Sequence, residues 1–159
     1  MTEAERGRAQ KAIMRYPLPF VVYRLEKEGN VPKEEIPGLV LEFRRFIICI
    51  LHSDSPVGMI SPVIDEVWHA FILHTREYAE FCQSIFGRFV HHAPNWPEQP
   101  LSGAGGSQFR NVYGRLFGQL PEIWTNHLDG QGGECSGTTN CQDPDCGDES
   151  CWTGCTVAD

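Results

Sequence analysis

The sequence is poor in the features that mark nucleic-acid-binding, membrane and secreted proteins. It has 13 Lys and Arg against 21 Asp and Glu, and the formal net charge of −8 is the wrong sign for holding a phosphate backbone. The longest apolar run in helix-like sequence is Phe46 to Leu51, far short of the roughly 20 residues that span a bilayer. The N-terminal residues include acids and no apolar core of a secretory signal. We therefore expect no nucleic-acid partner, no membrane association and a cytoplasmic location.

Several common enzyme motifs are also missing. The chain has no Gly-x-x-x-x-Gly-Lys phosphate loop, no Gly-x-Ser-x-Gly nucleophile elbow and no His-Glu-x-x-His pair of metal ligands. No stretch alternates apolar and polar residues for long enough to require a strand. These absences favour an all-α protein without one of these catalytic signatures.

Charge and cysteine divide the chain into a body and a tail. All 13 basic groups lie in residues 1–128, whereas residues 129–159 carry acids and no base, together with five of the 7 cysteines. This tail has almost no aliphatic residue and cannot bury enough apolar surface to fold by itself. We predict an N-terminal lead segment over residues 1–17, a helical domain over residues 18–128, and an irregular acidic Gly/Cys-rich tail over residues 129–159.

Apolar periodicity predicts about four amphipathic helices in the domain, packed as a small orthogonal bundle. Start and stop signals place these helices from Leu18 to Gly29, from Pro37 to His52, from Ser61 to Gly87 and from Ser107 to Gly118. The third is the longest, at about 24 residues by these signals. Three prolines exclude a helix interior between residues 91 and 100, and the glycines of residues 103–106 indicate a flexible connection.

Helical phase separates the expected core from the expected surface. The second helix places Glu42, Arg44 and Arg45 on its polar side. Cys49 and Cys82 fall at apolar phases and are expected to be small buried hydrophobic residues. Aromatic residues of the third helix are expected in the core or at its rim rather than as a stacking surface: Trp68, Phe71, Tyr78 and Phe81.

The third predicted helix carries the clearest candidate site. Asp65 and His69 are four residues apart, so their side chains lie on one helical face, and His91 and His92 follow the turn at Gly87. A carboxylate and two imidazoles are a ligand set for zinc or another transition metal, including iron and copper. The alternative is structural: His69 hydrogen-bonds Asp65, and the paired histidines bind backbone carbonyls of a loop. The sequence does not determine whether the chain returns far enough to bring His91 or His92 to the helix.

The tail cysteines form a second candidate metal site. Three loops of four, four and three residues separate the last four of them, a spacing used by thiolate zinc sites: Cys141, Cys146, Cys151 and Cys155. Neighbouring carboxylates raise the pKa of thiols and make them poor nucleophiles until a cation arrives. Disulfides would require an oxidising compartment. Cation binding, a disordered or modified tail and a disulfide knot remain three separate hypotheses.

A set of motifs in the body resembles the glycine-rich-domain-containing protein family. The resemblance rests on Ser61-Pro62, Asp65-Glu66-Val67-Trp68-His69, Ile72-Leu73-His74-Thr75 and His91-His92, with flanking matches that extend it over about residues 18–128. The chain is similar to short, bacterial-type members, because its tail is acidic and rich in cysteine rather than a long glycine tract. The resemblance implies no defined chemistry, since most of that family is biochemically uncharacterised.

Two functional hypotheses follow. The first is a small metal- or ligand-binding domain with a cation-binding tail and no catalysis, which would have a metal ion and a protein as its partners. The second is a metal-dependent enzyme in which Asp65, His69 and one of His91 or His92 leave coordination positions open. An enzyme needs an accessible site, whereas a structural site would be closed over by Trp68 and Trp96.

Overall fold

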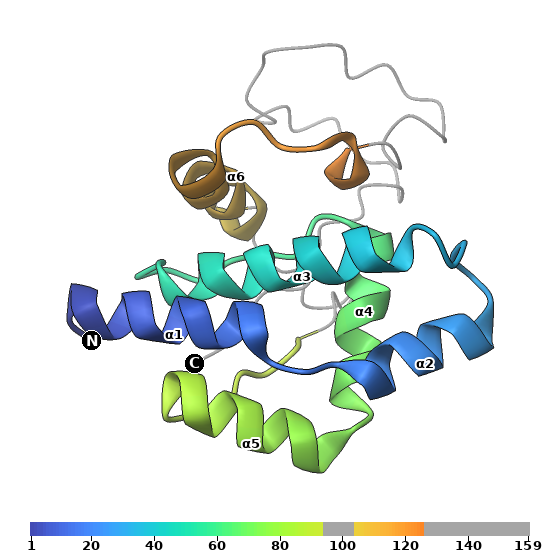
Figure 1. Ribbon diagram of the computed structural model, residues 1–159. Coiled ribbons are helices and arrows are strands. Elements are labelled where there is room, and N and C mark those ends of the chain that lie inside the picture. The colour runs from blue at the N-terminus through green and yellow to red at the C-terminus, as the bar shows by residue number, and fades with distance from the viewer. Residues whose placement is uncertain (94–103, 126–159) are drawn as a thin grey trace.

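The computed structural model describes residues 1–93 and 104–125, and the elements of these residues are helices (Figure 1). They are α1 (Glu3–Arg15), α2 (Pro19–Glu28), α3 (Ile36–Leu51), α4 (Pro62–Ile72), α5 (Thr75–Phe86), α6 (Ala104–Phe117) and the 3-10 helix η1 (Glu122–Trp124). No strand occurs within the described ranges. The all-α prediction is confirmed.

Helix α3 is the centre of the packing. It contacts α1, α2, α4 and α6, and Figure 1 shows α6 on one side of it and α1 with α5 on the other. Its second half, from Phe46 to Leu51, is buried all round, as expected for a helix surrounded by others. The short apolar run is therefore a central core helix. No helix in the described part of the chain is both long and apolar enough to cross a membrane.

Residues 1–17, predicted as a lead segment outside the helical domain, form a helix that packs on the body. Thr2 caps α1 in a capping box with Glu5, and Ile13 is buried. The Arg44 guanidinium donates to backbone carbonyls at the end of α1, those of Ile13, Met14 and Tyr16. The Thr-x-x-Glu pattern predicts a helix start, but α1 lacks a continuous apolar stripe, which is why periodicity missed it.

The long helix predicted from Ser61 to Gly87 is two helices. Helix α4 ends at Ile72, His74 has non-helical backbone angles, and α5 starts at Thr75. In one straight helix, Phe71 and Phe81 would lie about 15 Å apart along the axis, yet their rings are 5.3 Å apart, and both pack on Tyr16. The gain in aromatic packing explains a break at a place without proline or glycine.

The predicted flexible connection of residues 103–106 is helical from Ala104 onward, so α6 starts before Ser107. Gly58 donates its N–H to the Gly105 carbonyl at 2.9 Å. A Cβ at Gly58 would lie 3.0 Å from the Gly105 backbone, so only glycine permits this approach. The acidic tail and Trp96 lie outside the described residues, and the orthogonal arrangement of the bundle stays a prediction.

Candidate metal centre

Helix α4 places Asp65 and His69 on one face at the boundary between core and solvent. Ser61 caps the helix by accepting from the Ile64 N–H, and its own hydroxyl donates to the Ile123 carbonyl. Between the pair, Val67 and Trp68 are fully buried core residues, whereas Glu66 is exposed. Nε2 of His69 lies 3.4 Å from Oδ2 of Asp65, so the predicted i, i+4 contact is present.

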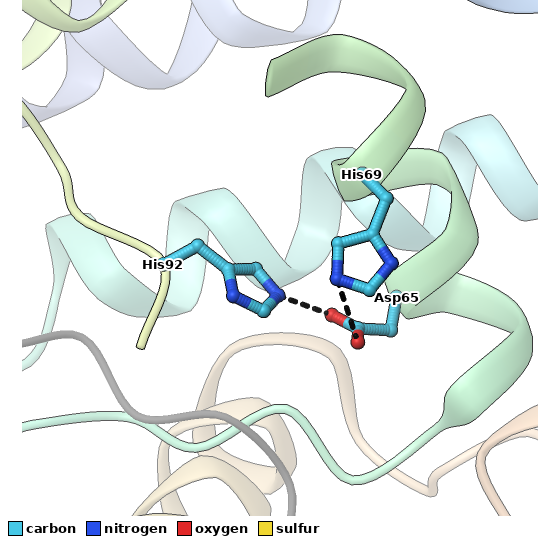
Figure 2. A group of neighbouring side chains, drawn as sticks. All are labelled: Asp65, His69 and His92. Atoms are coloured by element: carbon cyan, nitrogen blue, oxygen red, sulfur yellow. Dashed lines mark hydrogen bonds and ion pairs between the residues drawn. The ribbon is translucent and has the colours of Figure 1, made fainter. Parts of the chain in front are cut away.

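The chain returns to this face after α5. Gly87 ends α5 in the left-handed conformation at φ 68°, and buried Val90 anchors the segment that follows. His92 then reaches Asp65, with its Nε2 2.8 Å from Oδ1 (Figure 2). Because a carboxylate only accepts, the imidazole N–H donates in this contact. Each carboxylate oxygen of Asp65 thus faces one imidazole.

Two buried hydrogen bonds support the segment that carries His92. Trp68 donates its indole N–H to the Tyr78 hydroxyl at 3.0 Å, and that hydroxyl donates to the Val90 carbonyl at 2.6 Å. The rings of His92 and Trp68 pack edge to face, with 4.5 Å between their centroids. Burial raises the pKa of Tyr78 above its usual range, so its hydroxyl keeps its proton.

The cluster is buried on one side and open on the other. The side chain of His92 is 7% exposed and that of Asp65 16%, whereas His69 is 47% exposed. Figure 2 shows both imidazoles directed at the carboxylate between them. An ion or small molecule can therefore approach past His69 without opening the core.

One ligand atom from each of Asp65, His69 and His92 lies within 4.8 Å of the other two. Metal–nitrogen and metal–oxygen bonds of about 2.0–2.2 Å in a tetrahedral site hold such atoms roughly 3.3 Å apart. The two imidazole–carboxylate distances, 3.4 Å for His69 and 2.8 Å for His92, are near that spacing. The donor set of two imidazoles and one carboxylate fits a borderline transition metal.

The other predicted ligands do not join this cluster. His91 is exposed and its ring packs on Phe89, 4.9 Å away. Adjacent residues in an extended segment point to opposite sides, which explains why only His92 faces α4. The remaining predicted ligands, Cys141, Cys146, Cys151 and Cys155, lie outside the described residues. Cys49 and Cys82 are buried, as predicted, and burial raises the pKa of the Cys49 thiol to about 12.

Glu42, predicted on the polar side of its helix, is buried in a second polar cluster. Its carboxylate accepts from the Tyr113 hydroxyl, the Trp124 indole N–H and Arg45 at 2.7, 2.8 and 2.7 Å. Burial, followed by the hydrogen bond to Glu42, raises the pKa of Tyr113 to about 12. Glu42 can be buried because donors distant in sequence bind its carboxylate, and its position on the helix does not predict such donors. All of the carboxylate contacts are with side chains of α3, α6 and η1, which indicates a structural role.

The fold and the site define a small all-α protein with a cluster of two histidines and one aspartate at its surface. The chain belongs to the UCP032817-like family, whose model matches residues 8–103. The matched range includes Asp65, His69 and His92. No curated protein and no solved structure matches the chain, and the resemblance to glycine-rich-domain-containing proteins stays a prediction.

Proposed function

We propose that this protein is a metal-binding domain in which Asp65, His69 and His92 hold a divalent transition metal, with zinc as the first candidate. The observation that carries the proposal is the convergence of three ligand atoms within 4.8 Å from two separate segments. Ion pairing explains part of this arrangement, but it does not require two imidazoles on one carboxylate. Nitrogen and oxygen ligands of this kind are typical of zinc, iron, copper and nickel sites.

Metal binding would replace the two contacts that now join the rings to Asp65. Both Nε2 atoms face the carboxylate at 2.8 and 3.4 Å, so each ring would turn the same nitrogen to the ion. Any proton on that nitrogen is released, because a bound imidazole coordinates in its neutral form. Asp65 then supplies the negative charge that offsets part of the charge of the ion.

The experiment uses the full-length chain with the tail cysteines at positions 135, 141, 146, 151 and 155 replaced by serine, called here the tail-serine protein. Its zinc content after dialysis against a dilute zinc buffer is compared with that of His69→Ala. We expect His69→Ala to lose the bound zinc while its circular dichroism is unchanged, since His69 is half-exposed. The matched control is His74→Ala, which removes a part-buried imidazole that packs on Phe20 and should keep the zinc. Equal zinc contents in the two variants would contradict the proposal.

The exposure of His69 favours one alternative, a metal-dependent enzyme. Three protein ligands leave at least one position of a four-coordinate ion for water or substrate, and the two-histidine, one-carboxylate set is also used by iron oxygenases. Adding azide to the cobalt-loaded tail-serine protein tests whether the site meets one requirement of this enzyme. A change in the visible spectrum shows an open position, which catalysis needs. An unchanged spectrum would exclude the enzyme and leave metal binding as the remaining function.

The proposal includes the tail as a second, thiolate cation site. Cys141, Cys146, Cys151 and Cys155 lie outside the described residues, so this part rests on their spacing and on the surrounding acids. The reduced full-length protein should then bind more zinc or cadmium than the tail-serine protein, with release of thiol protons. If the tail instead contains disulfides, thiol reagents will not label it under denaturing, non-reducing conditions.

A further inference from the structure

A chain of two buried hydrogen bonds lies beside the candidate site and joins the two segments that build it. Its central atom is the hydroxyl of Tyr78, which accepts from the Trp68 indole at 3.0 Å and donates to the Val90 carbonyl at 2.6 Å. Trp68, Tyr78 and Val90 are 0%, 1% and 1% exposed as whole residues. No solvent water can therefore replace the hydroxyl in either bond, and both bonds depend on it.

Both histidines are close in sequence to this chain of bonds. Trp68 precedes His69 in α4, and Val90 is two residues before His92. A two-residue segment spans at most about 7 Å, so holding the Val90 carbonyl limits where the His92 backbone can lie. The ring of His92 also packs against Trp68, at 4.5 Å between centroids. One hydroxyl thus ties the backbone just before His92 to the buried face of α4.

The break between α4 and α5 is what makes this arrangement possible. Trp68 and Tyr78 are ten residues apart and would be separated by about 15 Å along one straight helix. The turn at Leu73 and His74 folds α5 back and brings the hydroxyl to the indole. Phenylalanine would fill the same space, but the Trp68 indole N–H and the Val90 carbonyl would both lose this partner.

We propose that Tyr78 is a positioning residue for the Asp65, His69 and His92 site, which fixes His92 in place before an ion binds by holding the backbone at Val90. The expected effect on metal affinity rests on the proposed function. The placement of His92 by Tyr78 does not depend on a metal. Residues that orient metal ligands without touching the metal change affinity by about 10–100-fold when they are removed.

The test compares Tyr78→Phe with Tyr113→Phe in the tail-serine protein. Each variant removes one buried hydroxyl from a hydrogen-bonded tyrosine, but the Tyr113 hydroxyl contacts Glu42 and Arg45 of α3 and not the candidate site. In calorimetric titrations with zinc, we expect Tyr78→Phe to lower the affinity by about 10–100-fold and Tyr113→Phe to leave it unchanged. An equal loss in both variants means a general loss of stability and overturns the proposal.

A second readout does not need the metal. In NMR spectra of the zinc-free protein, Tyr78→Phe should shift and broaden the ring signals of His92, while Tyr113→Phe leaves them in place. If zinc does not bind the parent protein, the proposed function fails, and the His92 signals still decide whether Tyr78 positions this residue. Unchanged His92 signals in a folded Tyr78→Phe variant overturn the inference even when zinc binds.

A third measurement covers the case in which Tyr78→Phe does not fold. Solvent exchange of two indole N–H groups that are buried in the described part of the chain, those of Trp68 and Trp124, is followed in the unsubstituted tail-serine protein with and without zinc. Trp124 is the internal control, since its indole donates to Glu42. Zinc should slow the exchange at Trp68 and not at Trp124, because an ion on His92 holds the Val90 segment closed. Equal effects at both indoles contradict the inference.

Discussion

A single carboxylate, Glu42, shows how one residue joins three elements of this protein. It is 6% exposed and receives hydrogen bonds from Arg45 within α3, from Tyr113 of α6 and from Trp124 of η1. Burying a charge costs free energy unless it is paired and hydrogen-bonded. Here Arg45 supplies the opposite charge, and Tyr113 and Trp124 donate the other hydrogen bonds to the carboxylate. The cluster therefore holds α6 and η1 on α3.

Replacing Glu42 with glutamine tests this role. The amide keeps the shape of the carboxylate but has one acceptor oxygen for three donors, and its NH₂ group faces donors. We expect Glu42→Gln to lower the free energy of unfolding by about 1–3 kcal/mol in urea titrations. The control is Glu26→Gln on the exposed face of α2, which should change it little. Equal stabilities of the two variants would show that the cluster contributes nothing.

Among the residues of the candidate site, two of the three could be placed together from the sequence. The four-residue spacing of Asp65 and His69 was enough to place them together, because helical geometry is local. The choice between His91 and His92 was not available, since it depends on how the chain leaves Gly87 and on the bonds at Val90. Tyr78 was expected only as a core aromatic, because its partners are contacts across a helix break.

At the scale of elements, caps decide where helices stop and where the chain goes next. Gly87 has a φ of 68°, and a Cβ there would meet no atom within 4 Å. An alanine at this position therefore suffers from its backbone conformation alone, which costs roughly 1–2 kcal/mol. Helix α5 depends on this turn to send the chain back along α4.

Two glycine substitutions test the role of the Gly87 cap, because we expect them to change the free energy of unfolding in opposite directions. Gly87→Ala should lower the free energy of unfolding by roughly 1–2 kcal/mol. Gly114→Ala, inside α6 where a Cβ also meets no atom, should raise it by about 0.5–1 kcal/mol, because alanine is the better helix former. Thermal and urea unfolding provide the measurement. A stabilised Gly87→Ala protein would show that the turn does not require its left-handed conformation.

The helix break is the element that sequence reasoning could not find. Leu73, His74 and Thr75 include neither proline nor glycine, and the apolar pattern continues through them. What breaks the helix is non-local: Phe71 packs on both Tyr78 and Phe81, and the ring of Tyr16 packs on Phe71 and Phe81. Apolar periodicity also did not predict helix α1, for the opposite reason. Its capping box is present in the sequence, but its buried face is too narrow to give an apolar period.

At the scale of the whole molecule, the core of the described residues is complete before the tail begins. The last buried residue of this core is Trp124, and the residues after 128 add acids and cysteines but little apolar area. Burial of apolar surface is the main stabilising contribution to folding. The tail should therefore contribute little to the stability of the body.

Ending the chain after Leu128 tests this division. We expect the shortened protein to keep its helical circular dichroism and a Tm close to that of the full chain. The comparison is made in reducing buffer with a chelator, so that metal bound by tail thiols does not shift the Tm of the full chain by mass action. An aggregated or unfolded shortened chain would contradict the assignment of body and tail.

Two adjacent histidines, His91 and His92, provide the sharpest comparison for the proposed metal site. Zinc is titrated calorimetrically into the tail-serine protein, into His92→Ala and into His91→Ala. His92 faces Asp65 at 2.8 Å, whereas His91 is exposed and packs on Phe89. We therefore expect zinc binding to be lost in His92→Ala and kept in His91→Ala. Zinc binding that is the same in both variants, or absent from the parent protein, would contradict a metal site at Asp65, His69 and His92.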